Sequence, residues 1–178
     1  MRENRKTINE KRRKLAFADI TIKNNSNAVL VLKSSKNGGT IYVLEPYEDT
    51  DIPFEDLQSV AKNHKRMFQA FDVIIDDVYC PEDESIDVED VEAVLGFQRL
   101  KKGLSDTPDD IMFDDMLLDY SVEEFEEELK TFNRQITERL IERAIFLYKR
   151  REFSNRFKMK MLEEKLKVEY VFEDIDMN

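Results

Sequence analysis

The longest regular pattern in this sequence is a run of apolar residues at helical spacing between residues 121 and 150. They recur every three or four positions and so share one face of a helix: Phe125, Leu129, Phe132, Ile136, Leu140, Ala144 and Leu147. Ser121 and Glu124 have the spacing of a capping box at the start of this helix. The pattern predicts one long helix from Ser121, followed by a second helix over residues 154–167.

The first half of the chain has a strand-like pattern instead. Short apolar segments at residues 17–23, 28–33 and 40–44 predict three strands, and the Asn-Gly-Gly turn in residues 36–39 joins the last two as a hairpin with the first as its third partner. Pro46 ends the third strand, and residues 48–52 are expected to cross the sheet edge. A helix begins near Pro53, and a last strand covers residues 71–77.

These patterns predict an α+β fold, in which a small antiparallel sheet with one packed helix is followed by an α-helical C-terminal half. The expected divisions are a basic N-terminal arm (residues 1–16), a small α+β domain (17–78), an acidic connector with short helices (79–120) and a helical C-terminal region (121–178). Within the connector, a helix over residues 87–103 is expected to end at Gly103 as its C-cap.

Charge is distributed in blocks of alternating sign. Residues 1–16 carry a net charge of +5, residues 76–128 a net charge of −17 and residues 130–167 a net charge of +7. Such blocks either fold against one another or neighbouring copies, or form separate solvated faces, and the sequence favours neither. The basic arm has too few apolar residues to fold alone, so its order must come from a partner or from the chain's own acidic block. The predicted partner-binding residues are Arg5, Lys6, Lys11, Arg12, Arg13, Lys14, Lys149, Arg150 and Arg151.

No motif in the chain predicts a chemical reaction. His64 is the single histidine and lies beside cations, and Cys80 has no second cysteine to pair with. Residues 83–90 have closely spaced carboxylates, but they lack the glycine and the glutamate positions of an EF-hand. The sequence therefore predicts no catalytic, cofactor or metal site, and it predicts a protein that is not an enzyme. A metal-dependent enzyme is the weakest of the functions considered, because the chain lacks a convincing set of metal ligands.

The sequence has neither a signal peptide nor a membrane-spanning run, so cytoplasmic synthesis is expected. The overall acidity, with an isoelectric point near 4.8, also opposes a dedicated nucleic-acid binder.

One long stretch resembles a known group of proteins. The segment ITIKNNSNAVLVLKSSKNGGTIYVLEPYEDTDIPFEDLQSV, which starts at Ile20, is similar to the opening of a group of tailed-bacteriophage virion and morphogenesis proteins. In that group a strand of the form I-x-V-x-N-x-S/T-N precedes a hairpin, a F-x-P-x-E-x-x-x-I-x-F-E-E-L segment and a helix. The resemblance covers about residues 19–75, and the helices after residue 121 also look like that group's C-terminal helices. The group's acidic-then-basic tail is missing here, and residues 76–118 are built differently.

The resemblance implies a non-enzymatic bacteriophage structural or assembly protein. It is expected to act through protein–protein contacts in the head, connector or tail of the virion, in several copies and with other virion proteins as partners. The alternative is an acidic, host-directed regulator that occupies a basic nucleic-acid-binding surface, and the net charge of −17 over residues 76–128 supports it.

Overall fold

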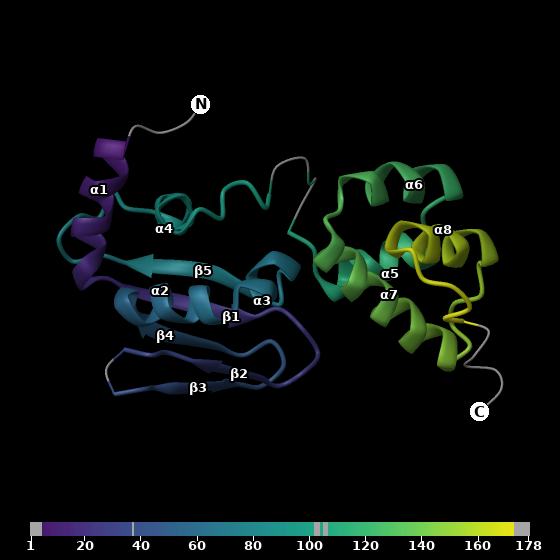
Figure 1. The fold of residues 1–178 in the computed structure, drawn as a ribbon, viewed down its shortest axis with the longest axis horizontal. Coiled ribbons are helices and arrows are strands. Elements are labelled where there is room, and N and C mark those ends of the chain that lie inside the picture. The colour runs from purple at the N-terminus through teal and green to yellow at the C-terminus, as the bar shows by residue number, and fades with distance from the viewer. Residues whose placement is uncertain (1–4, 37, 102–103, 105–106, 173–178) are drawn as a thin grey trace. The chain divides into compact units, whose positions relative to one another are not determined.

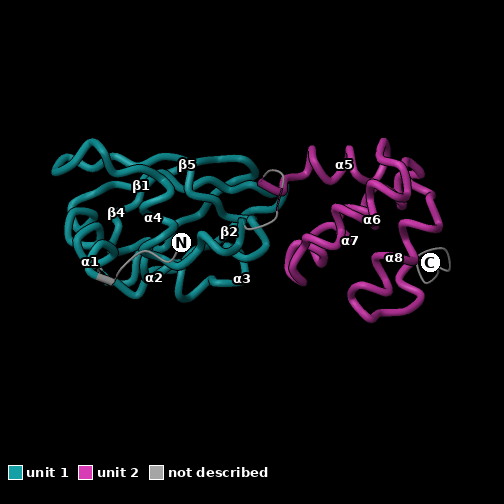
Figure 2. The backbone as a smooth tube through the Cα atoms, turned by 90° about the horizontal axis from the view of Figure 1, so that it is seen from above, with its two compact units in different colours: residues 1–102 teal, residues 103–178 magenta. Residues whose placement is uncertain are grey.

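The structure is a computed structural model that describes residues 5–36, 38–101, 104 and 107–172. Its strands lie in the N-terminal part and its C-terminal part is helical, which confirms the predicted α+β fold (Figure 1). The chain divides into two compact units, residues 1–102 and residues 103–178 (Figure 2). The connector expected over residues 79–120 is therefore shared between the two units.

The strands of unit 1 form two antiparallel sheets. A three-stranded sheet has the order β4-β1-β5, and a separate two-stranded sheet pairs β2 with β3. The bounds are β1 Asp19–Asn24, β2 Leu30–Lys33, β3 Ile41–Leu44, β4 Asp49–Pro53 and β5 Val73–Tyr79. The expected hairpin of β2 and β3 is present. The prediction that the first strand joins this hairpin is wrong, because β1 pairs with β4 and β5 instead. The segment expected to cross the sheet edge, residues 48–52, forms most of β4 instead.

Helices cover the sheets of unit 1 and complete its core. They are α1 Arg5–Lys14, the 3₁₀ turn η1 Leu15–Phe17, α2 Phe54–Asn63, α3 Lys65–Ala70 and α4 Val88–Leu95. Phe54, Leu57 and Val60 of α2 are buried, and so are Val91 and Val94 of α4. The prediction that this last helix reaches Gly103 is wrong. It ends at Leu95, because Gly96 takes the left-handed conformation that terminates a helix.

Two buried polar side chains hold the two sheets and α2 together. Asn24, at the end of β1, donates through its side-chain amide to the carbonyl oxygens of Ala28 (2.7 Å) and Glu45 (2.9 Å). Its side-chain oxygen accepts from the backbone and the hydroxyl of Ser26. Asp56 of α2 accepts from the hydroxyl of Ser34 (2.5 Å) and from that of Tyr42 (2.6 Å). The N-x-S-N segment at residues 24–27 therefore leaves β1 through a bend that the buried Asn24 and Ser26 side chains hold.

Unit 2 consists of packed helices: α5 Asp110–Leu118, α6 Val122–Thr131, α7 Arg134–Lys149 and α8 Arg156–Leu166. The predicted capping box of Ser121 and Glu124 is present. The predicted single helix from Ser121 is wrong, since the backbone becomes extended at Phe132 and Asn133 caps a new helix by accepting from the Ile136 backbone N–H (2.9 Å). Phe132 is still buried, so the apolar period continues across the break.

Candidate functional site

The basic arm is the helix α1, and it packs on α4 within unit 1. The Lys11 ammonium pairs with Asp90, and the Lys14 ammonium lies 2.7 Å from Asp83. The Arg12 guanidinium donates to the Val94 carbonyl oxygen at 3.5 Å. In the structure, therefore, the arm is ordered by contacts with the chain's own acidic block, and no partner is needed for these contacts.

The acidic loop over residues 83–90, for which the sequence predicts no metal site, is engaged with this arm. The hydrogen bond from Lys14, together with those from the Ser85 hydroxyl and backbone, holds the pKa of Asp83 well below its usual range. Asp87 and Asp90 form the capping box of α4. Among the described residues, no three histidine, cysteine or acidic side chains gather as metal ligands would.

The predicted partner-binding residues divide between the two units. Lys6 and Arg13 are exposed on α1, while the side chain of Arg5 lies outside the described part of the structure. Lys149, Arg150 and Arg151 are exposed at the end of α7 in unit 2. The Arg150 guanidinium pairs with Glu152 (2.8 Å) and lies over the Phe146 ring. Of the eight predicted residues with described side chains, five therefore belong to unit 1 and three to unit 2.

Unit 2 also brings the acidic and basic blocks together. The Arg139 guanidinium, which is buried, donates to Asp110 (3.0 Å) and to the Pro108 carbonyl oxygen (3.2 Å). The Arg143 guanidinium donates two hydrogen bonds to the Asp114 carboxylate (2.5 and 2.6 Å). These bonds fasten α5 to α7. Sequence reasoning did not single out these residues, although the alternating charge blocks were the signal that pointed to such pairing.

The one histidine and the one cysteine each contact backbone groups within unit 1. His64, next to the end of α2, accepts a hydrogen bond at Nε2 from the Lys33 backbone N–H (2.9 Å). Burial and the nearby Lys33 charge both lower the pKa of His64. Cys80 is buried, and its thiol lies 3.5 Å from the Lys14 carbonyl oxygen. Each of these side chains therefore contacts a backbone group of another segment of unit 1.

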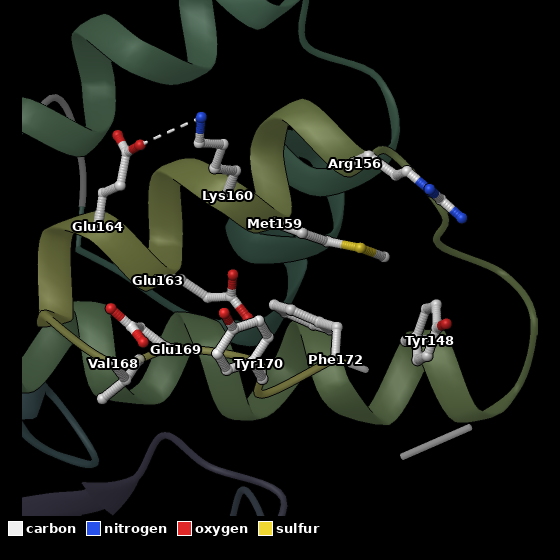
Figure 3. A pocket seen from close by; sticks show the side chains of 10 residues that line it. All are labelled: Tyr148, Arg156, Met159, Lys160, Glu163, Glu164, Val168, Glu169, Tyr170 and Phe172. Atoms are coloured by element: carbon white, nitrogen blue, oxygen red, sulfur yellow. Dashed lines mark ion pairs between the residues drawn. The ribbon is translucent and has the colours of Figure 1, made fainter. Parts of the chain in front are cut away.

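A hollow of about 500 Å³ lies in unit 2 between α8, the end of α7 and residues 168–172 (Figure 3). Met159, Tyr148 and Phe172 form part of its apolar wall. The charged side chains around it include Lys160 and Glu164, whose charged groups lie 3.7 Å apart. The Glu163 carboxylate accepts from the Val171 backbone N–H (2.8 Å), so it holds the wall itself. These groups stabilise the hollow and do not converge on one point where a reaction would take place.

The outer face of the β2–β3 hairpin is a group of exposed apolar side chains that the packing of unit 1 does not explain. Its inner face, with Leu30, Leu32 and Leu44, is buried in the core. Its outer face has four β-branched apolar side chains that are about half exposed: Val29 51%, Val31 43%, Ile41 56% and Val43 57%. Val31 and Val43 are direct cross-strand partners. We call these four residues the hairpin face.

The hairpin face has the composition of a buried surface. Strands that are apolar on both sides are typical of sheets that are covered on both faces, whereas a strand facing water alternates apolar and polar residues. In the structure, only one side of this hairpin is covered by the rest of unit 1. Contiguous exposed apolar residues of this kind mark interaction sites. The hairpin face is therefore our candidate functional site.

Comparison with family models, curated protein sequences and solved structures finds no match to this chain. None of the helices in the described part of the chain combines the length and the apolar character needed to cross a bilayer.

Proposed function

We propose that this protein is a non-enzymatic structural or assembly component of a tailed bacteriophage, which acts through protein–protein contacts in the virion. The hairpin face is the observation that carries the proposal. Four neighbouring β-branched side chains on one rigid sheet present an apolar surface, and covering such a surface is favourable by roughly 25 cal/mol per Å² of apolar area removed from water. The same stretch of sequence carries the resemblance to phage virion and morphogenesis proteins.

The hairpin face is well suited to a persistent contact. The buried carboxylate of Asp56 bonds to side chains from both sides of the hairpin connection, Ser34 and Tyr42, and so fixes the sheet on α2. A preformed surface loses little conformational entropy when a partner covers it. The protein is accordingly a component that other virion or assembly proteins contact, in a particle formed in the host cytoplasm.

The alternative, an acidic regulator of a basic nucleic-acid-binding protein, has weaker support. Four of the carboxylates that such a regulator would present are paired inside the chain: Asp83, Asp90, Asp110 and Asp114. Of the exposed glutamates of α6, Glu126 is paired with Lys130, and Glu123 remains for this role. A regulator would be recovered with a host protein and would be missing from finished particles.

Mass spectrometry of purified virions and of assembly intermediates tests the proposal. We expect this chain in one or both at a fixed copy number relative to the major capsid protein. The chain's absence from both, together with its recovery on a host DNA- or RNA-binding protein, would contradict the proposal and support the regulator.

A further inference from the structure

Two side chains of opposite charge, Lys33 and Glu45, flank the hairpin face at its two ends. In the register of β2 and β3, Val31 stands opposite Val43, and Lys33 stands opposite Ile41. Continuing this register by one pair places Val29 opposite Glu45. The outer side of the hairpin therefore has a lysine at one corner, a glutamate at the diagonally opposite corner and apolar side chains between them. Both charged side chains are exposed.

A surface of this kind is complementary to itself. A two-fold axis that lies in the plane of the contact, perpendicular to the diagonal from Lys33 to Glu45, brings one copy's Lys33 to the other copy's Glu45. The apolar residues of the two copies then face one another at the centre. Each contact of this type is made twice, because the two copies are equivalent.

The edge of β2 favours stacking of faces over the addition of a strand. At Lys33, the backbone N–H donates to His64 Nε2 and the backbone carbonyl oxygen accepts from the side-chain amide of Asn63 (3.0 Å). Both backbone groups of Lys33 on that edge are therefore engaged with residues at the end of α2. An incoming strand would have to displace them, whereas a sheet stacked on the hairpin face displaces neither.

We propose that the hairpin face binds the hairpin face of a second copy of this chain, with Lys33 of each copy beside Glu45 of the other. This inference rests on the proposed function, since it names the partner of the same surface. The pair is the unit that enters assembly, and its affinity depends on salt because its rim contacts are ionic.

Sedimentation equilibrium of the full chain over a range of concentrations tests this inference through charge reversal. Lys33→Glu and Glu45→Lys each place like charges together twice in a symmetric pair, so each variant alone is expected to raise the dimer dissociation constant about tenfold or more. A mixture of the two variants restores both opposite-charge contacts, and so does the double variant. Lys62→Glu reverses an exposed charge on α2, away from the hairpin face, and is expected to leave the dissociation constant unchanged. Circular dichroism melting shows that each variant is folded.

Two results would overturn the inference: a chain that stays monomeric at every concentration, or a mixture of the two variants that associates no better than either variant alone. The virion measurement is independent of this test. A monomeric chain that is recovered in particles overturns the homotypic pair and leaves the proposed function standing. A chain that pairs as described but is absent from particles supports the pair and contradicts the proposed function.

Discussion

Lys158 of α8 is fully buried, and replacing it tests how unit 2 is held together. Its exposed fraction is 1%, and its ammonium donates to the carbonyl oxygens of Met116 (2.8 Å) and Leu117 (2.9 Å). These carbonyls are in the last turn of α5, where the helix supplies no partners and the dipole favours a cation. The ammonium also lies 5.5 Å from the centre of the Phe125 ring.

Lys158→Met keeps the length of the side chain but leaves both carbonyl oxygens without this donor. A hydrogen bond from a charged group contributes about 1.5–3 kcal/mol, and an unsatisfied buried polar group costs about 1–3 kcal/mol. Burial of the ammonium, which lowers the pKa of Lys158, offsets part of this stabilisation. We therefore expect Lys158→Met to lower the free energy of unfolding by about 2–4 kcal/mol.

Urea unfolding of the full chain, followed by circular dichroism and by amide hydrogen exchange, measures this loss. Exchange is needed because two compact units can unfold separately, and it assigns the loss to α5 and α8. Lys160→Met is the matched control on the same helix, where the exposed pair with Glu164 is worth at most about 1 kcal/mol. If Lys158→Met were as stable as the natural chain, the cost of burying the ammonium would outweigh its bonds and this reasoning would be refuted.

Two further predictions concern unit 1. Burial and the hydrogen bond to Asp56 raise the pKa of Tyr42 to about 12. Asp56→Ala is expected to move this pKa part of the way back towards 10, which NMR titration of labelled tyrosines would show. The same substitution is expected to destabilise unit 1 by about 2–3 kcal/mol, because the Ser34 and Tyr42 hydroxyls lose their acceptor. The pKa of His64 is lower in the folded chain than in the unfolded chain, so the unfolded chain takes up the proton first as the pH falls. The stability contributed by neutral His64 is therefore complete above pH 6.5 and is lost progressively below it. His64→Gln, which keeps an acceptor for the Lys33 N–H, should flatten this pH dependence in urea unfolding, and an unchanged slope would contradict the assignment.

Local patterns predicted the elements of this protein better than their pairing. The Asn-Gly-Gly turn and the flanking apolar residues indicated the hairpin, and the capping box located the start of α6. The partners of β1 are distant in sequence, and no local signal assigned them. Within β4, Ile52 is the buried residue among acidic and polar neighbours, so its pattern was too weak to indicate a strand.

The two wrong helix ends have local physical causes. The apolar period continues through Phe132, which is buried, so periodicity alone did not show the helix break at Phe132 and Asn133. The side chain of Asn133 caps α7, and this turn chemistry outweighed the period. Gly96 ended α4 one turn beyond Val91 and Glu92, whereas the expected C-cap, Gly103, lies outside the described residues.

The sequence alone did not identify the hairpin face as a candidate site. Residues 28–33 form an apolar run on both sides of the strand, and such a run does not show which side the fold covers. The structure resolved this by burying Leu30 and Leu32 and exposing Val31. The basic residues of the arm drew attention in the sequence instead, and several of them are engaged with the chain's own α4 and acidic loop.

The copy number of Val43 variants in purified particles tests the central claim most directly. Val43→Lys places a charge in the middle of the hairpin face, while the exposed position 43 leaves the core of unit 1 intact. Ile111→Lys, at an exposed apolar position of α5 in unit 2, is the matched control. Quantitative mass spectrometry should find the natural chain and Ile111→Lys at equal copy number and Val43→Lys reduced about tenfold or more, as a loss of about 1.4 kcal/mol in binding would produce. Incorporation of Val43→Lys at the natural level would contradict the claim that the hairpin face carries the function.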